Sequence, residues 1–209
     1  MSTNFDEAAA TWDTPEKVER SRRIAEAIAA RVPLTVDWVA LDYGCGTGQL
    51  TWHLAERLGR VILVDTSEGM LDVARAEAAR RDPDRYPVSQ LDLTTAAPKE
   101  PVDLVMSAMT LHHVPQTQAL VSGVRGALRP GGWVALADLD ADPENLFHDD
   151  GYTGHRGIDR DRLADQLRAT GFADVTTETA ATVSKTKDGI DREFTVFLLT
   201  ARVPGSTTP

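Results

Sequence analysis

Apolar positions follow two different periods along the first two thirds of the chain. Apolar residues at spacings of three and four, typical of one helix face, follow Thr14, Gly48, Ser67 and Pro115. Short continuous apolar runs lie between these segments, as in strands that are buried on both faces. The runs expected to form strands are 36–43, 60–65, 86–93, 102–109 and 129–140. Strands that alternate with helices predict a mostly parallel sheet.

The last third of the chain has a different pattern. Asp159 is a candidate N-cap for a helix that ends at Gly171. Residues 172–185 and 192–202 are rich in β-branched and aromatic side chains, and the short segment between them contains Asp188-Gly189. This pattern predicts an antiparallel hairpin. The expected fold is therefore α/β, with a seven-stranded, mostly parallel sheet, a C-terminal antiparallel hairpin and helices on both faces.

A length of 209 residues suits one domain, which we expect over 1–203. Within it we expect an N-terminal lid and helix over 1–33 and a cap loop over 140–157. The cap loop is long and polar, and such loops in compact domains are often functional. Residues 204–209 are expected to be a disordered tail.

Composition narrows the class of protein. The hydrophobic content of 42% is ordinary, no apolar run is long enough to cross a membrane, and the acidic N-terminal segment is unlike a signal peptide. The single cysteine suits a reducing compartment. We therefore expect a cytoplasmic protein without membrane contact. The net charge of −10 disfavours nucleic acid as a partner, because phosphate backbones bind basic surfaces.

Three glycines, Gly44, Gly46 and Gly48, lie between the first predicted strand and a helix. A strand, glycine turn and helix form a ligand site at the carboxyl edge of a parallel sheet. The spacing G-x-G-x-G lacks the third glycine of the dinucleotide fingerprint G-x-G-x-x-G. Asp42, directly before the loop, would repel a pyrophosphate and suits a cationic group such as an ammonium.

Two further acids follow predicted strands. Asp65 ends the second strand about 20 residues after Gly44, the separation at which an acid accepts hydrogen bonds from ribose hydroxyls. Asp92 is expected to end the third strand. Three carboxylates at three neighbouring strand ends predict a slot for a ligand with a ribose, a base edge and a positive end.

These segments resemble a known family. "VALDYGCGTGQL", "VILVDTSEGML", "QLDL", "VDLVMSAMTLHHV" and "LRPGGWVALADLD" are similar, in order and spacing, to the successive motifs of class I S-adenosylmethionine-dependent methyltransferases. The resemblance covers about 5–203 and is strongest to the small-molecule branch around ubiquinone and menaquinone biosynthesis. It implies a Rossmann-like fold, S-adenosylmethionine as cofactor, and methyl transfer to an oxygen, nitrogen, sulfur or carbon atom of a small-molecule acceptor.

The resemblance also implies residue roles. Asp42 would lie near the cofactor's ammonium group, Asp65 would bind the ribose, and Asp92 would accept from the adenine amino group. Met70 would pack on the adenine, or serve only as core, and Asp92 is alternatively a turn residue. The expected cofactor-binding residues are Trp12, Asp42, Gly44, Cys45, Gly46, Asp65, Thr66, Met70, Asp92, Leu93 and Ala108.

Catalytic residues are harder to predict, because the sulfonium is already activated. The protein must mainly hold the acceptor in line with the methyl group, and a base is needed only if the acceptor loses a proton. His113 and His148 are the candidates, although both are also consistent with pocket lining. Some relatives carry a histidine at the position of His113 within a metal motif, but the preceding glutamate is missing here. We therefore expect no metal.

The sequence also excludes several acceptors and leaves two alternatives. The segment "SAMT" replaces the motif of DNA amino-methyltransferases, and Cys45 is misplaced for cytosine methylation. A small-molecule acceptor and a monomer or homodimer are expected. The alternatives are a non-catalytic S-adenosylmethionine-binding protein and, less favoured by the glycine spacing, a nucleotide-dependent oxidoreductase.

Overall fold

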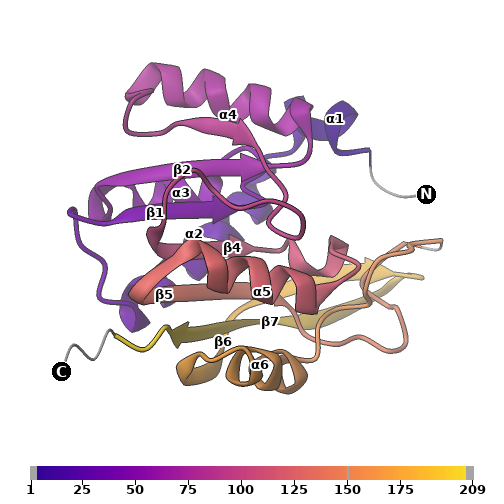
Figure 1. The fold of residues 1–209 in the computed structure, drawn as a ribbon. Coiled ribbons are helices and arrows are strands. Elements are labelled where there is room, and N and C mark those ends of the chain that lie inside the picture. Colours follow the sequence, from indigo (N-terminus) through magenta and orange to yellow (C-terminus); the bar gives the residue numbers. More distant parts are fainter. Residues whose placement is uncertain (1–3, 150, 206–209) are drawn as a thin grey trace.

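The sheet of this protein, in a computed structural model that describes residues 4–149 and 151–205, has seven strands in the order β3-β2-β1-β4-β5-β7-β6 (Figure 1). The strands are β1 (Val39–Tyr43), β2 (Arg60–Asp65), β3 (Val88–Gln90), β4 (Val102–Ala108), β5 (Leu128–Leu139), β6 (Ala173–Lys187) and β7 (Ile190–Arg202). The first five strands pair in parallel, and β7 pairs antiparallel with both β5 and β6. The predicted Rossmann-like α/β fold is confirmed.

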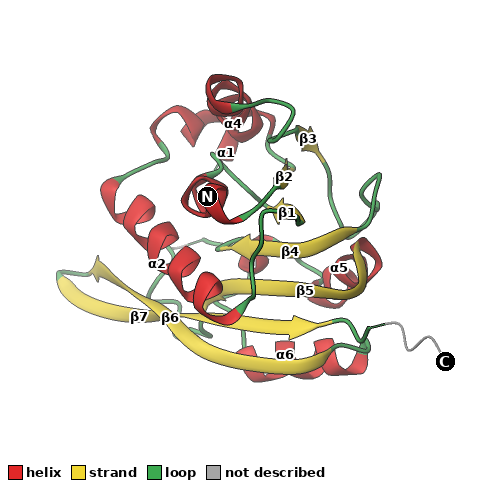
Figure 2. Cartoon of the chain, turned by 90° about the vertical axis from the view of Figure 1, so that its left-hand side faces the viewer, coloured by secondary structure: helices red, strands yellow, loops and turns green. Residues whose placement is uncertain are grey.

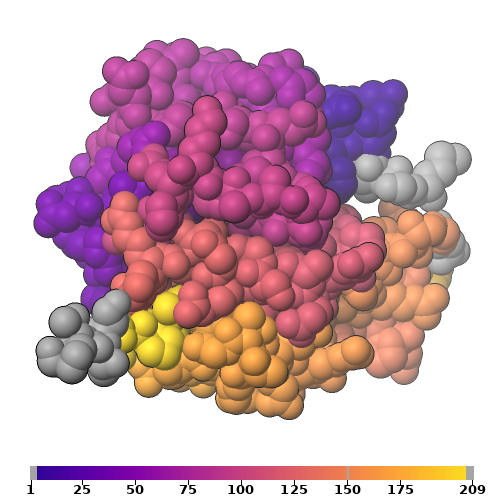
Figure 3. Space-filling model, in the orientation of Figure 1, coloured from indigo at the N-terminus to yellow at the C-terminus, as the bar shows by residue number. Residues whose placement is uncertain are grey.

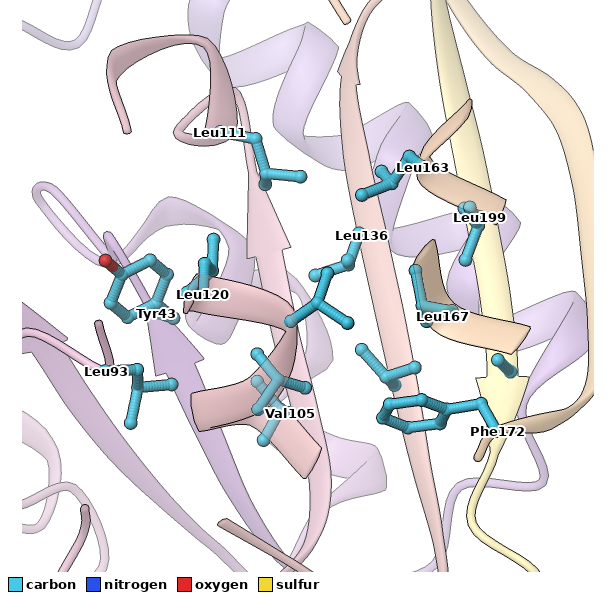
Figure 4. Packing of buried hydrophobic residues seen from close by; sticks show 14 of the residues in the cluster. Tyr43, Leu93, Val105, Leu111, Leu120, Leu136, Leu163, Leu167, Phe172 and Leu199 are labelled. Atoms are coloured by element: carbon cyan, nitrogen blue, oxygen red, sulfur yellow. The ribbon is translucent and has the colours of Figure 1, made fainter. Parts of the chain in front are cut away.

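Helices cover both faces of the sheet. They are α1 (Phe5–Ala8), α2 (Pro15–Arg31), α3 (Gln49–Leu54), α4 (Glu68–Arg81), α5 (Thr117–Ala127) and α6 (Arg160–Ala169), with short 3-10 helices at Ala9–Thr11, Ala55–Arg57 and Leu111–His113. Figure 2 shows α2 and α4 on one side of the sheet and α5 and α6 on the other. Each side has its own hydrophobic cluster. In the cluster under α5 and α6, Leu120, Leu163 and Leu167 lie around Leu136 of β5 (Figure 4).

Local sequence signals account for the helix starts. The Thr14 side chain accepts a hydrogen bond from the Lys17 amide with proline at the first helical position, and Ser67 accepts one from the Met70 amide. The Asp159 carboxylate accepts from the amides of Asp161 and Arg162. These side chains satisfy amides that have no partner within the helix. All three predicted N-caps are confirmed.

Two predicted strands are shorter than expected. The strand predicted over 36–43 begins only at Val39, and Val36 is exposed. The strand predicted over 86–93 is reduced to Val88–Gln90, so Asp92 does not end a strand. Instead, the Asp92 side chain accepts a hydrogen bond from the Thr94 amide, which closes a turn. The apolar residues of the sequence could not reveal where this strand ends, because β3 lies at the edge of the sheet and pairs only with β2.

The C-terminal hairpin extends beyond the sheet and holds the predicted cap loop. Its turn has positive φ angles at Asp188 (54°) and Gly189 (73°), as the sequence predicts for a tight hairpin. Lys185 donates to the Phe147 carbonyl and to Asp149, and Lys187 donates to the carbonyls of Asn145 and His148. Residue 150 of the cap loop, residues 1–3 of the predicted lid and residues 206–209 of the predicted tail lie outside the described residues.

Phe197 of β7 is fully buried where β7 pairs with β5 and β6. We expect Phe197→Ala to lower the free energy of unfolding by about 3–5 kcal/mol, because it removes a large buried ring and leaves a cavity. Urea denaturation followed by circular dichroism measures this loss. Ile190→Ala on the exposed hairpin end is the control, with an expected change within about 0.5 kcal/mol. Equal losses in the two variants would contradict this assignment of the core.

Candidate active site

A cavity opens at the carboxyl edge of the sheet, where the strand order reverses between β1 and β4. Ligands of open α/β sheets bind at this switch point. The cavity encloses about 880 Å³ of space, part of which is open to solvent. A second cavity adjoins it and shares Gly44, Asp65, Thr66, Thr110 and His113. Together the two cavities form one continuous candidate site along the ends of β1, β2 and β4.

Most residues predicted to bind cofactor line these cavities. Those lining the first cavity are Trp12, Asp42, Gly44, Cys45, Gly46, Asp65, Thr66, Met70 and Ala108. Asp92 lines the second cavity, and its carboxylate also accepts from the Tyr43 hydroxyl at 3.2 Å. Leu93 lines neither cavity and lies in the core cluster under α5.

The glycine loop adopts a backbone that other residues rarely adopt. Gly44 and Gly46 have φ angles of 66° and 54°. A Cβ atom on Gly44 would lie only 2.2 Å from Cγ2 of Thr110. Met109, at the end of β4, also has a positive φ of 58°, which is uncommon outside glycine. The backbone is therefore tightly turned where the loop after β1 meets the end of β4.

Asp65 ties this loop to the end of β2. Its Oδ2 accepts from the Gly46 amide at 2.9 Å, and its Oδ1 accepts from the amides of Thr66 and Ser67 at 2.7 and 3.0 Å. The carboxylate lines both cavities. The Asp65 carboxylate is therefore fixed in position and reachable by a ligand. Both conditions are needed if it is to accept hydrogen bonds from the two hydroxyls of a diol.

Asp42 is almost completely buried and accepts a hydrogen bond from the Thr51 hydroxyl at 2.7 Å. Burial raises the pKa of its carboxyl to about 7, and the nearby negative charge of Asp65 adds to this effect. The Thr51 hydrogen bond opposes the shift. A cationic ligand group beside Asp42 would stabilise the ionised form.

The N-terminal segment forms one wall of the cavity, because two of its aspartates bind opposite sides of the site. Asp6 accepts from the Ser67 hydroxyl at 2.6 Å and from the Gly69 amide at 2.9 Å, at the start of α4. Asp13 accepts from Thr47 at 2.7 Å and from Gln49 at 2.8 Å, at the start of α3. Negative charge is favourable at helix N-termini. Figure 3 shows these N-terminal residues (indigo) packed beside the magenta segment that carries α4.

Trp12 has two contacts of its own in this wall. Its ring packs edge-to-face on Phe5 at 5.6 Å, and Lys17 Nζ lies 3.3 Å from its centroid. The Lys17 charge is thereby held on the ring face, a favourable cation–π arrangement.

Arg20 is a site residue that sequence analysis missed. It lines the first cavity from α2, and its Nε atom is buried without a hydrogen-bond partner among the described residues. Asp138 contributes a favourable charge, but no ion pair within 4 Å joins the two side chains across the described chain. An arginine in an amphipathic helix is normally solvated, so the pattern alone gave no signal. A partly buried guanidinium with an unpartnered Nε atom favours an anionic ligand group.

The two predicted catalytic histidines lie in different places. His113 lines both cavities, and burial lowers the pKa of its imidazole to about 4, assisted by the charge of His112. His148 lines neither cavity and stacks on Tyr152 with ring centroids 3.8 Å apart. His112 is buried, with Nδ1 bound to Asp138. Only His113 is therefore in direct reach of a bound ligand.

Two kinds of feature are absent from the described residues. No group of three or more His, Cys, Asp or Glu side chains within 4–149 and 151–205 is arranged to hold a metal ion. Over the same ranges, no helix is long and apolar enough to span a bilayer.

The raised pKa of Asp42 makes stability depend on pH. Its folded pKa of about 7 exceeds the ordinary 3.8, so the folded state binds more protons between these values. The free energy of unfolding therefore falls as pH rises through this window, by at most about 4 kcal/mol from this group. We expect Asp42→Asn to raise the free energy of unfolding relative to the wild type by more at pH 8 than at pH 5, as measured by urea denaturation. The exposed Asp37→Asn is the control, and parallel pH profiles for the wild type and Asp42→Asn would refute the assignment.

The chain is similar to proteins of known type. Residues 40–132 match the family of methyltransferase domains. A ubiquinone biosynthesis O-methyltransferase of Leptothrix cholodnii is 27% identical over 68% of this chain and 64% of its own length. A trans-aconitate 2-methyltransferase of Streptomyces avermitilis is 32% identical over 77% of this chain and 63% of its own length. The chain thus spans less than two thirds of these curated relatives.

A solved structure shows the same fold. Phosphoethanolamine N-methyltransferase 2 of Haemonchus contortus, in complex with S-adenosyl-L-methionine, superposes with a TM-score of 0.70 at 19% identity. The match covers 98% of this chain and 60% of that one. The matched domain and the curated relatives, together with the glycine loop and the acids at the ends of β1 and β2, support a class I S-adenosylmethionine-dependent methyltransferase.

Proposed function

We propose that this protein transfers the methyl group of S-adenosylmethionine to a small-molecule acceptor. The observation that carries the proposal is the set of charges in one cavity: Asp42, Asp65 and Arg20 all line it. The cofactor has three matching parts, an ammonium, a ribose diol and a carboxylate. A dinucleotide would instead bring a pyrophosphate beside two carboxylates.

Each part of the cofactor has a proposed partner. Asp42 lies near the ammonium, Arg20 binds the carboxylate of the methionine portion, and Asp65 accepts from both ribose hydroxyls. Gly44, Gly46 and Ala108 leave room for the methionine chain, with Cys45 and Thr66 beside them. Met70 packs against the adenine, and Asp92 in the second cavity accepts from its amino group. Trp12 closes the N-terminal side, and Leu93 supports the adenine end from the core.

The chemistry is an in-line displacement on the sulfonium methyl group. The acceptor atom forms a bond to the methyl carbon as the carbon–sulfur bond breaks, and the electron pair stays on sulfur. The protein contributes alignment and exclusion of water, which together supply much of the rate. The N-terminal segment with Asp6 and Asp13 bound to α4 and α3 serves this exclusion.

We infer that the acceptor atom is oxygen. Two relatives, an O-methyltransferase of ubiquinone biosynthesis and a trans-aconitate 2-methyltransferase, support this choice. His113, Met109 and Phe5 line the cavity where the acceptor would lie. A single domain over 1–203, a cytoplasmic location, a monomer or homodimer and the absence of nucleic-acid partners stay predictions.

Turnover separates catalysis from cofactor binding alone. A non-catalytic S-adenosylmethionine-binding protein would have the same cofactor site, so binding does not exclude it. Incubation with S-adenosylmethionine and a library of hydroxylated and carboxylated compounds, with S-adenosylhomocysteine measured as product, decides between the two. Formation of product with one compound class supports an enzyme, and none with any compound favours the binding protein.

Calorimetric titration tests which cofactor the protein binds. We expect binding of S-adenosylmethionine and S-adenosylhomocysteine in preference to NAD. Asp65→Ala should weaken binding of S-adenosylhomocysteine about 10- to 100-fold, because hydrogen bonds to a charged group contribute roughly 1.5–3 kcal/mol. The exposed Asp37→Ala is the control, and thermal unfolding shows whether each variant is folded. Preferential NAD binding, or unchanged affinity in a folded Asp65→Ala variant, would overturn the proposal.

The role of Arg20 has a separate test. Arg20→Met keeps the length of the side chain and removes its charge. We expect it to weaken S-adenosylhomocysteine binding about tenfold or more and to leave 5′-methylthioadenosine almost unaffected, because the latter lacks the carboxylate. Arg22→Met, on the exposed side of α2 beside Glu19, is the matched control. Equal weakening of both ligands would show that Arg20 supports the fold of the site instead.

A further inference from the structure

The cap loop places a tyrosine hydroxyl beside His113. Oη of Tyr152 lies 2.9 Å from the His112 carbonyl oxygen and 2.9 Å from Nδ1 of His113. Tyr152 lines neither cavity, whereas His113 lines both. The Nδ1 edge of the imidazole therefore faces the cap loop, and the other edge of the ring, which carries Nε2, is left for the cavity.

The hydroxyl has one proton, and the two contacts compete for it. A carbonyl oxygen only accepts, so the Tyr152 hydroxyl donates to the His112 carbonyl. The hydroxyl oxygen then accepts from His113, which requires the His113 proton to be on Nδ1. With the pKa of His113 lowered to about 4, the ring is neutral near pH 7. Nε2 is then an unprotonated acceptor.

Packing holds Tyr152 in this position. His148 stacks on its ring at 3.8 Å and an interplanar angle of 12°. A Cβ atom on Gly154 would lie 2.1 Å from the Tyr152 hydroxyl oxygen and 2.6 Å from the His112 carbonyl oxygen, so only glycine permits the close approach. The His155 amide also donates to the His112 carbonyl at 2.8 Å. The hydroxyl is therefore a fixed partner of His113.

We propose that Tyr152 is a positioning residue that holds His113 as the Nδ1–H tautomer, so that Nε2 accepts the proton of a hydroxyl acceptor during methyl transfer. This inference rests on the proposed methyl transfer to oxygen. As the oxygen–methyl bond forms and the carbon–sulfur bond breaks, the hydroxyl proton passes to Nε2 and then to water. The products are the methyl ether or ester, S-adenosylhomocysteine and a proton. His148 stacks on Tyr152 and therefore acts on His113 through Tyr152.

The tautomer is measurable without knowledge of the acceptor. Long-range proton–nitrogen NMR correlations on ¹⁵N-labelled protein at pH 7 distinguish protonated from unprotonated ring nitrogens, and His113→Gln assigns the signals. We expect Nδ1–H in the wild type and a shift towards Nε2–H in Tyr152→Phe, which keeps the stacked ring. Tyr86→Phe, a buried tyrosine that lines neither cavity and packs on Trp52, is the matched control. An Nε2–H ring in the wild type, or the same tautomer in both proteins, would overturn the inference.

Two further measurements separate this inference from the proposed function. Tyr152→Phe should bind S-adenosylhomocysteine within about twofold of the wild type, because Tyr152 is outside both cavities. With the hydroxyl compound found in the turnover screen, kcat should fall about tenfold or more at unchanged KM for S-adenosylmethionine. Unchanged kcat would overturn the role of Tyr152. Failure of the wild type to bind S-adenosylhomocysteine would instead overturn the proposed function and leave the tautomer result standing.

Discussion

The hydrogen bond from the Gly46 amide to the Asp65 carboxylate joins the ends of two neighbouring strands, and the cavity is built around it. It holds the loop after β1 against the end of β2, while Thr110 at the end of β4 fills the space that a side chain on Gly44 would need. Gly44 is thus required by the contact with Thr110, and Gly46 is favoured by its positive φ of 54°. The same carboxylate that fixes the protein backbone remains available to a ligand, so the site is ordered before anything binds.

Charge in the cavity is balanced locally and differs from the charge of the whole chain. The net charge of −10 disfavours anionic partners at long range. Within the cavity, however, Asp13 is bound to Thr47 and Gln49, Lys17 lies on the Trp12 ring, and Arg20 keeps a buried, unbonded Nε atom. The combination favours a zwitterion over a simple cation. This refines the expectation from the sequence, which considered only the positive end of the ligand.

Local signals made much of the fold predictable, and long-range contacts account for what was missed. N-caps at Thr14, Ser67 and Asp159 and the Asp188-Gly189 turn depend on a few neighbouring residues, which is why they were read correctly. The end of β3 depends on whether an edge strand finds a partner, so Asp92 was misplaced. Tyr152 lies 39 positions from His113, and the partly buried surroundings of Arg20 are made by other elements. No periodicity in the sequence encodes such contacts.

The hairpin lysines give the cap loop a support that is remote from the cofactor. Lys185 and Lys187 bind carbonyl groups at Phe147, Asn145 and His148, just before the residue that contacts His113. The glycine loop and Asp65, by contrast, make no hydrogen bond to the hairpin within the described parts of the chain. Changes at the hairpin lysines would therefore alter the support of the cap loop and leave the hydrogen bonds between the glycine loop and Asp65 intact. For an engineer, the hairpin is the place to diversify first.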